Sequence, residues 1–245
     1  VVTDEKTGTK YPLADYALTP DVAIIDPNLT LSVPAAVTAD TGMDVLSHAL
    51  ESYVSVMASD YTDPLAIRAI QLVFEHLPVA YKDGANLLAR EKMHNASTIA
   101  GLAFTNAMLG VNHCLAHILG ATFHIAHGRA NAAVMIPVIR FNAALPGKVA
   151  AYPKYAFPHA AERYAEIASA LKLEASTPEK GCESLIRAVA ELKAKLDIPP
   201  TIREFGVPRA AFEAKVRHMA EVAFDDQCVG TNPCYPLLDD LVRLL

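Results

Sequence analysis

The chain has 245 residues, of which 52% are hydrophobic and 20% are charged, so it is globular and long enough to bury a large core, as one domain or as one domain with a fragment of another. Its net charge of −6 and the lack of a lysine–arginine stripe argue against nucleic acid as a partner. No apolar run is long enough to cross a bilayer, so we expect no membrane partner.

The first 33 residues carry the β signal of the chain. VVTDEKTGTKYPLADY, residues 1–16, predicts a strand, a tight turn at EKTG and a returning strand. DVAIIDP, residues 21–27, predicts a buried strand that Pro27 closes. A hairpin normally belongs to a sheet, and the rest of the chain offers little from which to build one. We therefore expect the sequence to be part of a longer protein.

After residue 33 the apolar residues recur at helical spacing, and alanine and leucine favour helices. Pro34 suits a helix start and Thr41 suits a helix cap, while Pro78 is expected to stop the second helix. Before the histidine-rich segment, helices are predicted over 41–57, 63–81 and 87–110. After it they are predicted over 160–173, 178–197, 207–224 and a short stretch at the end, with loops at 145–159, 198–206 and 225–236.

The segment VNHCLAHILGATFHIAHGRANA, residues 111–132, holds four of the nine histidines. His113 and His117 are four apart, so they share one face of a helix. An unbroken helix would place His127 about 21 Å from His113, too far for one ion. If these two share a metal, the helix ends between them and a new helix starts at His127, which Gly128 follows.

A second pair of candidate ligands, Asp44 and His48, is also spaced for one helix face. One such pair usually marks a solvated face, and a lone histidine on an apolar helix is usually a hydrogen-bonded core residue. Two pairs in the most apolar helices favour a metal, because a buried Asp44 without a partner is costly. With His113 and His127 they form a set of three nitrogens and one oxygen, which suits Fe²⁺, Zn²⁺, Ni²⁺ or Co²⁺ better than Mg²⁺ or Ca²⁺.

Two further residues are candidates for roles beside the metal. His117 lies one turn past His113, poorly placed to bind the ion but able to relay a proton or bind a substrate. Phe104, on the helix before His113, is a candidate for lining a pocket; the alternative is that it packs in the hydrophobic core. Other catalytic motifs, HExxH, GxSxG, the P-loop and GxGxxG, are missing from the sequence.

The four cysteines form no CxxC motif, and nothing at the N-terminus resembles a signal peptide. We expect free thiols in a cytoplasmic protein.

GMDVLSHALESYVS and GVNHCLAHILGATFHIAHGRANA together resemble the iron-containing (group III) alcohol dehydrogenase family. The likeness is greatest to the alcohol dehydrogenase part of bifunctional aldehyde-alcohol dehydrogenases, and YPLADYALTPDVAIIDP and AFDDQCVGTNPCYPL share it. It implies a mainly α fold, the all-helical metal-binding domain of dehydroquinate synthase-like proteins. Residues 34–245 are then this catalytic domain, and residues 1–33 are a β remnant of the α/β nucleotide-binding domain.

The same resemblance implies Asp44, His48, His113 and His127 as ligands of Fe²⁺. It implies that His117 lies near the nicotinamide of NAD(H) and helps to transfer a proton. It also implies that Phe104 lines the substrate pocket.

As an activity, the resemblance implies the fermentative, NADH-linked interconversion of acetaldehyde, or another short aldehyde, and its primary alcohol, by a homo-oligomer. Asn112 and Cys234 depart from the family pattern, since we expect a small or apolar residue at the first and arginine at the second. The Gly-rich turn of the nucleotide-binding domain is not in the sequence, so we expect the chain alone to bind metal with little or no turnover.

Two alternatives remain open: a Zn²⁺-dependent polyol or glycerol dehydrogenase-like enzyme, and a non-catalytic, metal-stabilised assembly module.

Overall fold

The computed structural model describes residues 2–3, 10–11, 15–144 and 159–245. Over these residues the chain is mainly α-helical, as predicted. The α-helices are α1 Ala35–Val54, α2 Asp63–Lys82, α3 Leu87–Ala107, α4 Val111–Phe123, α5 His127–Ala143, α6 Ala160–Ala170, α7 Pro178–Lys195, α8 Arg209–Glu213, α9 Val216–Phe224 and α10 Leu238–Leu244. The short elements are β1 Val2–Thr3, β2 Lys10–Tyr11 and the 3-10 helices η1 Tyr16–Leu18, η2 Pro27–Thr30, η3 Ile202–Phe205 and η4 Gln227–Thr231.

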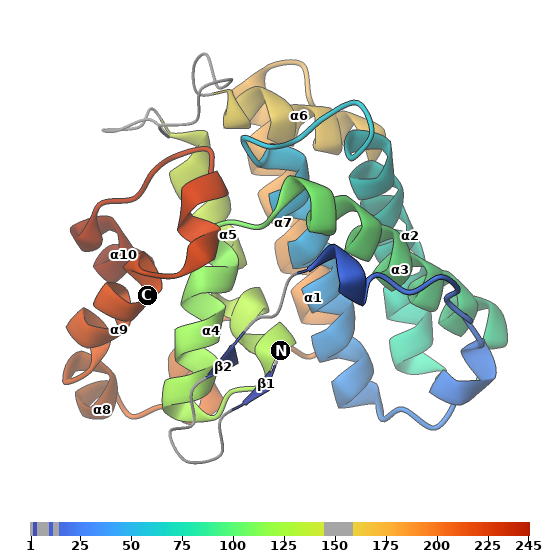
Figure 1. Ribbon diagram of the computed structural model, residues 1–245, viewed down its shortest axis with the longest axis horizontal. Helices are drawn as coiled ribbons and strands as arrows, with labels where there is room; N and C mark the ends of the chain where they lie inside the picture. Colours follow the sequence, from blue (N-terminus) through green and yellow to red (C-terminus); the bar gives the residue numbers. More distant parts are fainter. Residues whose placement is uncertain (1, 4–9, 12–14, 145–158) are drawn as a thin grey trace.

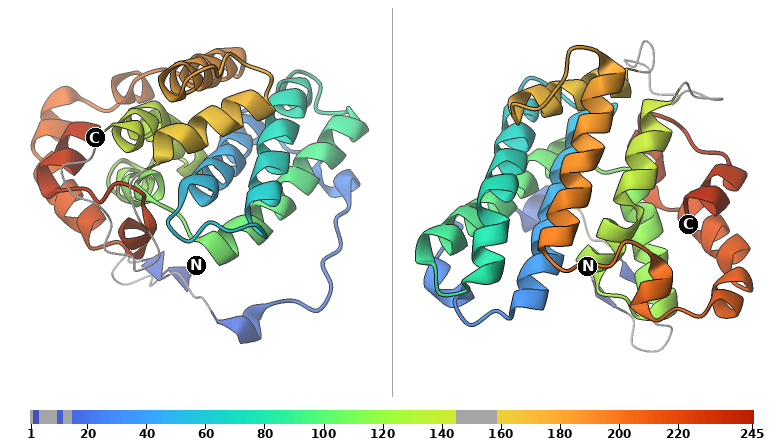
Figure 2. Two further views of the ribbon diagram at one scale, coloured as in Figure 1. Left: turned by 90° about the horizontal axis from the view of Figure 1, so that it is seen from above. Right: turned by 180° about the vertical axis from the view of Figure 1, so that it is seen from behind.

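Helix α1 lies in the middle of the molecule, with α2 and α3 on one side and α5 on the other (Figures 1 and 2). One apolar cluster joins α1 to α2, α3, one side of α5, α6 and α7, and it includes the fully buried Leu46 and Leu185. A second cluster joins α4 and α5 to α9 and α10 and includes Leu115 and Met219. Helix α1 belongs to the first cluster and α4 to the second, so side chains that face across this boundary are held by two separate cores.

The N-terminal segment confirms one β prediction and contradicts the other. Strands β1 and β2 pair antiparallel, as a hairpin requires, while the predicted turn lies outside the described residues. The strand predicted over 21–27 is wrong, because this stretch is irregular and the side chains of Val22 and Ile24 are 76% and 86% exposed. A strand needs a neighbour for its backbone groups, and among the described residues only β1 and β2 pair.

Helix α1 begins where Pro34 predicts a helix start, and it continues through the cap predicted at Thr41. Pro34 is its N-cap, so Thr41 lies inside the helix and does not cap it. The hydroxyl of Thr41 donates a hydrogen bond to the carbonyl of Val37, 2.8 Å away, which lets this residue sit in a helix interior.

Pro78 does not stop α2, which continues to Lys82. A proline inside a helix removes one hydrogen bond. Leu77 and Ala80 on either side of it are fully buried, and their packing outweighs that loss.

The histidine-rich segment is broken where the metal hypothesis requires. Helix α4 ends at Phe123, His124 adopts a left-handed conformation with φ of 54°, and α5 begins at His127. Before it, α3 and α4 meet at a bend of 110°. Within the described part of the chain no single helix is long and apolar enough to span a membrane, and only this bent pair meets the criterion jointly.

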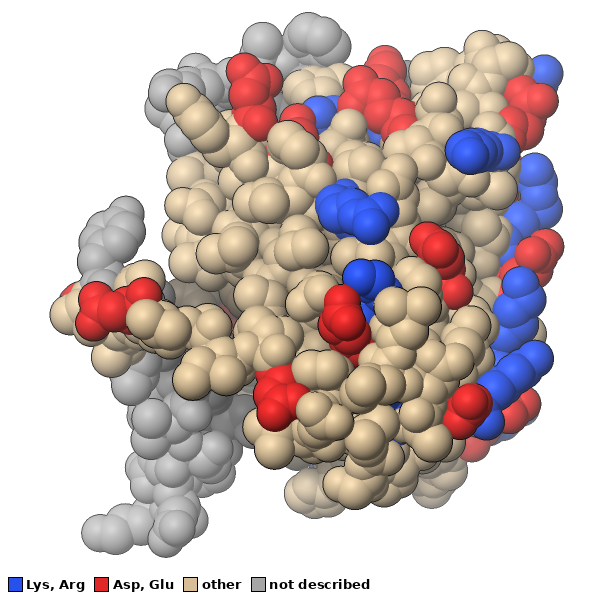
Figure 3. Space-filling model, turned by 90° about the vertical axis from the view of Figure 1, so that its right-hand side faces the viewer, with Lys and Arg blue, Asp and Glu red and all other residues tan. Residues whose placement is uncertain are grey.

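The four cysteines are buried and free, as predicted. The face on the α2 and α3 side of the molecule carries basic and acidic side chains interspersed with uncharged residues (Figure 3). This face therefore shows no continuous basic surface of the kind that binds nucleic acid.

Candidate metal centre

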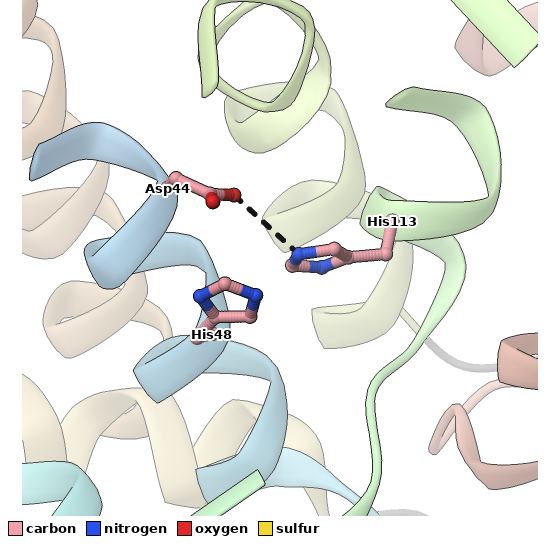
Figure 4. A group of neighbouring side chains, drawn as sticks. All are labelled: Asp44, His48 and His113. Atoms are coloured by element: carbon pink, nitrogen blue, oxygen red, sulfur yellow. Dashed lines mark ion pairs between the residues drawn. The ribbon is translucent and has the colours of Figure 1, made fainter. Parts of the chain in front are cut away.

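Three side chains from two helices converge at the boundary between the two apolar clusters. Asp44 and His48 lie one turn apart on α1, and His113 lies in the first turn of α4. Each offers one ligand atom, and these atoms lie within 4.8 Å of one another. In Figure 4 the Asp44 carboxylate points toward the His113 ring, and the His48 ring lies beside it. The structure thus brings together three of the four predicted ligands.

His127 lies at the open side of this group, as the first residue of α5. Its Nε2 is 3.4 Å from Asp44 Oδ1, and its ring centroid is 5.4 Å from that of His113. The glycine after it makes this approach possible. A Cβ on Gly128 would lie 1.8 Å from the carbonyl oxygen of Asp40, so any other residue would push α5 away from α1.

Asn131, one turn into α5, connects the candidate ligands. Its side-chain amide donates to Asp44 Oδ1 at 2.7 Å and lies 3.4 Å from His113 Nε2 and 3.2 Å from His127 Nε2. The orientation of this amide is set by Asn112, whose amide donates to Asn131 Oδ1 at 2.7 Å. Asp44 therefore has polar partners even without a metal.

The pKa values of the three convergent groups are shifted. Burial, together with the nearby His113, lowers the pKa of His48 to about 3, which keeps the imidazole in the neutral form that binds metals. Burial opposes ionisation of Asp44, but the hydrogen bond from His113 and the neighbouring histidines lower its pKa to about 2. Burial also disfavours a charged His113, but the carboxylates of Glu51 and Asp44 raise its pKa to about 10.

His117 lies next to the group but outside it. Its ring stacks on that of His127, with centroids 5.4 Å apart, and its centroid is 6.0 Å from that of His113. Its Nδ1 is 2.8 Å from Oδ2 of Asp226, just before η4, and its side chain is 42% exposed. One ring nitrogen is thus bound to a carboxylate, and the ring is open to solvent.

Phe104 reaches the centre from α3. Its half-buried ring stacks on His48, with centroids 4.4 Å apart and planes inclined by 17°. The phenyl ring therefore covers the face of His48 that does not meet His113, whose ring lies 4.6 Å from His48.

A model of the C-terminal part of Fe-containing alcohol dehydrogenases matches residues 38–245. The chain belongs to the Fe-containing alcohol dehydrogenase family. It is 51% identical over its whole length to the aldehyde-alcohol dehydrogenase of Streptococcus pneumoniae serotype 2, and it spans 28% of that protein.

Solved structures of an alcohol dehydrogenase and of an aldehyde reductase resemble the chain. The iron-containing alcohol dehydrogenase of Thermococcus thioreducens has a TM-score of 0.80 and 34% identity, with 94% of this chain and 55% of that chain covered. The sulfoacetaldehyde reductase of Bifidobacterium kashiwanohense, in complex with NAD⁺, has a TM-score of 0.81 and 30% identity. The match covers 100% of this chain and 58% of the reductase chain.

The donor groups at the centre fit the iron that the family name of these alcohol dehydrogenases implies. A carboxylate and imidazoles form a borderline-soft set that suits Fe²⁺. Asp44, which is half-buried, and Glu51, which is buried, bring two carboxylates close to His113, where a cation offsets their charge.

Several residues at this alcohol dehydrogenase centre were not predicted from the sequence. Glu51 lies seven residues after Asp44 and three after His48, so its spacing on the same helix face is a signal that was available. Asn131 lies four residues after His127 and carries the same kind of signal. Asp226 carries no such spacing signal, because only the tertiary fold brings it to His117.

Proposed function

We propose that the chain is the metal-binding half of an Fe²⁺-dependent alcohol dehydrogenase. The whole enzyme would use NADH to interconvert a short aldehyde, such as acetaldehyde, and its primary alcohol. The convergence of Asp44, His48 and His113, with His127 beside them, is the observation that carries this proposal. Membership of the Fe-containing alcohol dehydrogenase family supports the metal and the reaction class.

In this proposal Asp44, His48, His113 and His127 hold the ion. When bound, Fe²⁺ supplies a Lewis acid for the oxygen of the aldehyde or alcohol. Phe104 and His113 enclose the ring of His48, which keeps water from this side of the centre. We propose that Phe104 also lines the pocket of the short aliphatic substrate.

His117 is the proposed proton-transfer residue. Its Nδ1–H donates to Asp226, so the proton given to the carbonyl oxygen is a second one, which Nε2 takes up from solvent before the aldehyde gains hydride from NADH and becomes an alcohol. In the reverse direction Nε2 takes this proton back. The exposed edge of the ring gives the proton a route to solvent.

We propose that residues 1–33 are the last part of a nucleotide-binding domain and that residues 34–245 are the catalytic domain. The apolar side chains of Val22, Ile24 and Leu29 are 76%, 86% and 76% exposed, which suits a segment covered by the rest of a longer protein. The NAD⁺ complex of the sulfoacetaldehyde reductase supports NAD(H) as the cofactor. We also propose that the whole protein is a homo-oligomer.

Anaerobic reconstitution with Fe²⁺ tests the proposal, followed by metal quantification and an assay of NADH oxidation with acetaldehyde. We expect one tightly bound iron per chain and little turnover by the chain alone. His113→Ala should lose the iron, whereas His218→Ala, which changes an exposed histidine of α9, should keep it. A wild-type chain that binds no stoichiometric metal would contradict the proposal.

The same donor set also suits Zn²⁺, which favours a polyol dehydrogenase-like enzyme as the second candidate. Metal content after expression, and a preference for a polyol over a short primary alcohol, would distinguish the two.

A further inference from the structure

Glu51 is buried behind His113, on the side of the ring away from Asp44. Its side chain is 5% exposed and comes from α1, one turn beyond His48. Its Oε2 contacts Nδ1 of His113, and its Oε1 accepts a hydrogen bond from the backbone N–H of Asn112 at 2.6 Å. Both carboxylate oxygens are thus bound to neighbouring residues of α4.

We propose that Glu51 is a positioning residue of the metal centre, which holds a proton on Nδ1 of His113 and so aims the Nε2 lone pair at the ion. This inference rests on the proposed function, because it assigns a role toward the metal that Asp44, His48 and His113 would hold.

The chemistry of the two partners fixes the tautomer. An ionised carboxylate only accepts hydrogen bonds, so the Nδ1 that faces Glu51 carries the hydrogen. The neutral ring then has its lone pair on Nε2, which lies 3.6 Å from Asp44 Oδ1. A histidine that binds metal commonly donates its other N–H to a carboxylate in this way, which fixes the orientation of the ring.

The second oxygen of Glu51 fixes the backbone that carries His113. The first N–H groups of a helix lack partners within the helix. In α4 the N–H of Asn112 finds Glu51, and the N–H of Val111 finds Asn232 Oδ1 at 3.1 Å. A Cβ on Gly110 would lie 2.9 Å from Glu51 Oε1, so the glycine makes room for this contact. One side chain therefore sets both the start of α4 and the ring orientation of its metal-facing histidine.

Glu51→Gln separates this role from simple packing. Glutamine has one acceptor oxygen, but Asn112 N–H and His113 Nδ1–H both need an acceptor. If the oxygen serves Asn112, the NH₂ group faces Nδ1, and the proton moves to Nε2, where it blocks the metal. Glu51→Asp keeps both oxygens on a shorter side chain and should restore part of the metal affinity.

The experiment measures Fe²⁺ affinity of the full chain anaerobically by competition with a chelator, and the absorption spectrum of the Co²⁺-substituted protein. We expect Glu51→Gln to weaken Fe²⁺ binding by about 10–100-fold and to change the Co²⁺ spectrum. Nitrogen NMR of the wild type loaded with diamagnetic Zn²⁺ should place the His113 hydrogen on Nδ1, which faces Glu51. Glu166→Gln is the matched control, since this glutamate accepts a hydrogen bond from Tyr53 on α1 outside the centre, and its affinity and spectrum should match the wild type.

Equal Fe²⁺ affinity and an unchanged Co²⁺ spectrum in Glu51→Gln would show that Glu51 is only structural, and would leave the proposed function intact. Failure of the wild-type chain to bind either metal would overturn both proposals. If Glu51→Gln does not fold, Glu51→Asp and the NMR spectrum of the Zn²⁺-loaded wild type decide, because a hydrogen on Nε2 of His113 in that spectrum would contradict the inference.

Discussion

The partner of His117 lies 109 residues further along the chain. Burial opposes ionisation of Asp226, but hydrogen bonds from His117 and from the backbone of Cys228 outweigh it and lower its pKa to about 2. The ordinary value is 3.8, so the hydrogen bonds to the Asp226 carboxylate stabilise the fold fully above that pH. The contribution is lost as the pH falls through about 2, because the Asp226 carboxylate of the folded state is then protonated.

Asp226→Asn should therefore destabilise the chain in a pH-dependent way. We expect it to lower the free energy of unfolding by roughly 1–2 kcal/mol near neutral pH, since His117 is partly exposed, and by roughly half as much near pH 3. Urea unfolding of wild type and variant at both pH values measures this. Asp239→Asn, at a side chain 79% exposed, should have little effect at either pH. An equal loss at both pH values for Asp226→Asn would contradict the electrostatic explanation.

At the scale of single residues, the sequence identified side chains whose spacing on one helix carries information. Asp44 with His48, and His113 with His117, are such pairs, and the structure places all four around one centre. Residues that act through contacts between distant segments, such as Asp226, leave no periodic signal. Asn112 was recognisable only as a departure from the family pattern. Its amide in fact bonds Ser47 Oγ, at 2.6 Å, and Asn131, inside the core.

The close packing of α5 on α1 depends on one glycine. Gly128→Ala would bring a Cβ into the backbone carbonyl of Asp40, so the start of α5 must move away from α1. We expect a loss of roughly 2–3 kcal/mol in the free energy of unfolding and weaker Fe²⁺ binding, because His127 moves with the helix. Chemical denaturation and chelator competition measure the two effects.

Gly101→Ala is the control for this prediction. Gly101 lies in the interior of α3, and a Cβ there meets no atom within 4 Å. The substitution should stabilise the chain by about 0.5–1 kcal/mol, because alanine loses less backbone freedom on folding. Equal destabilisation by both substitutions would mean that the contact with Asp40 is not the cause.

At the scale of elements, the sequence predicted the break between α4 and α5 because one ion cannot reach both His113 and His127 along a straight helix. The predictions from local sequence were wrong where contacts with distant segments decide the local structure. Residues 21–27 have the composition of a buried strand, but a strand forms only beside another strand. Pro78 is a strong local stop signal, yet burial of its neighbours carries α2 past it.

Across the whole molecule, the candidate centre lies where the two apolar clusters meet. Asp44 and His48 belong to a helix of the first cluster, and His113 belongs to a helix of the second. Helix α5 contributes apolar side chains to both clusters and packs against both α1 and α4. The polar contacts at this boundary, with any ion bound there, therefore act together with α5 to hold α1 and α4 in place.

A metal at this boundary should stabilise the whole fold, because it binds the folded chain and the unfolded chain has no such site. At a free Fe²⁺ concentration 100 times the Kd, linkage gives about 2.7 kcal/mol of added stability. We expect the Tm measured anaerobically to rise with Fe²⁺ and to fall again when a chelator is added. His113→Ala should abolish this rise in Tm. His218→Ala changes an exposed histidine of α9 and should retain the rise. A Tm that does not respond to Fe²⁺, in a chain shown to bind the ion tightly, would mean that the unfolded chain binds the ion equally well.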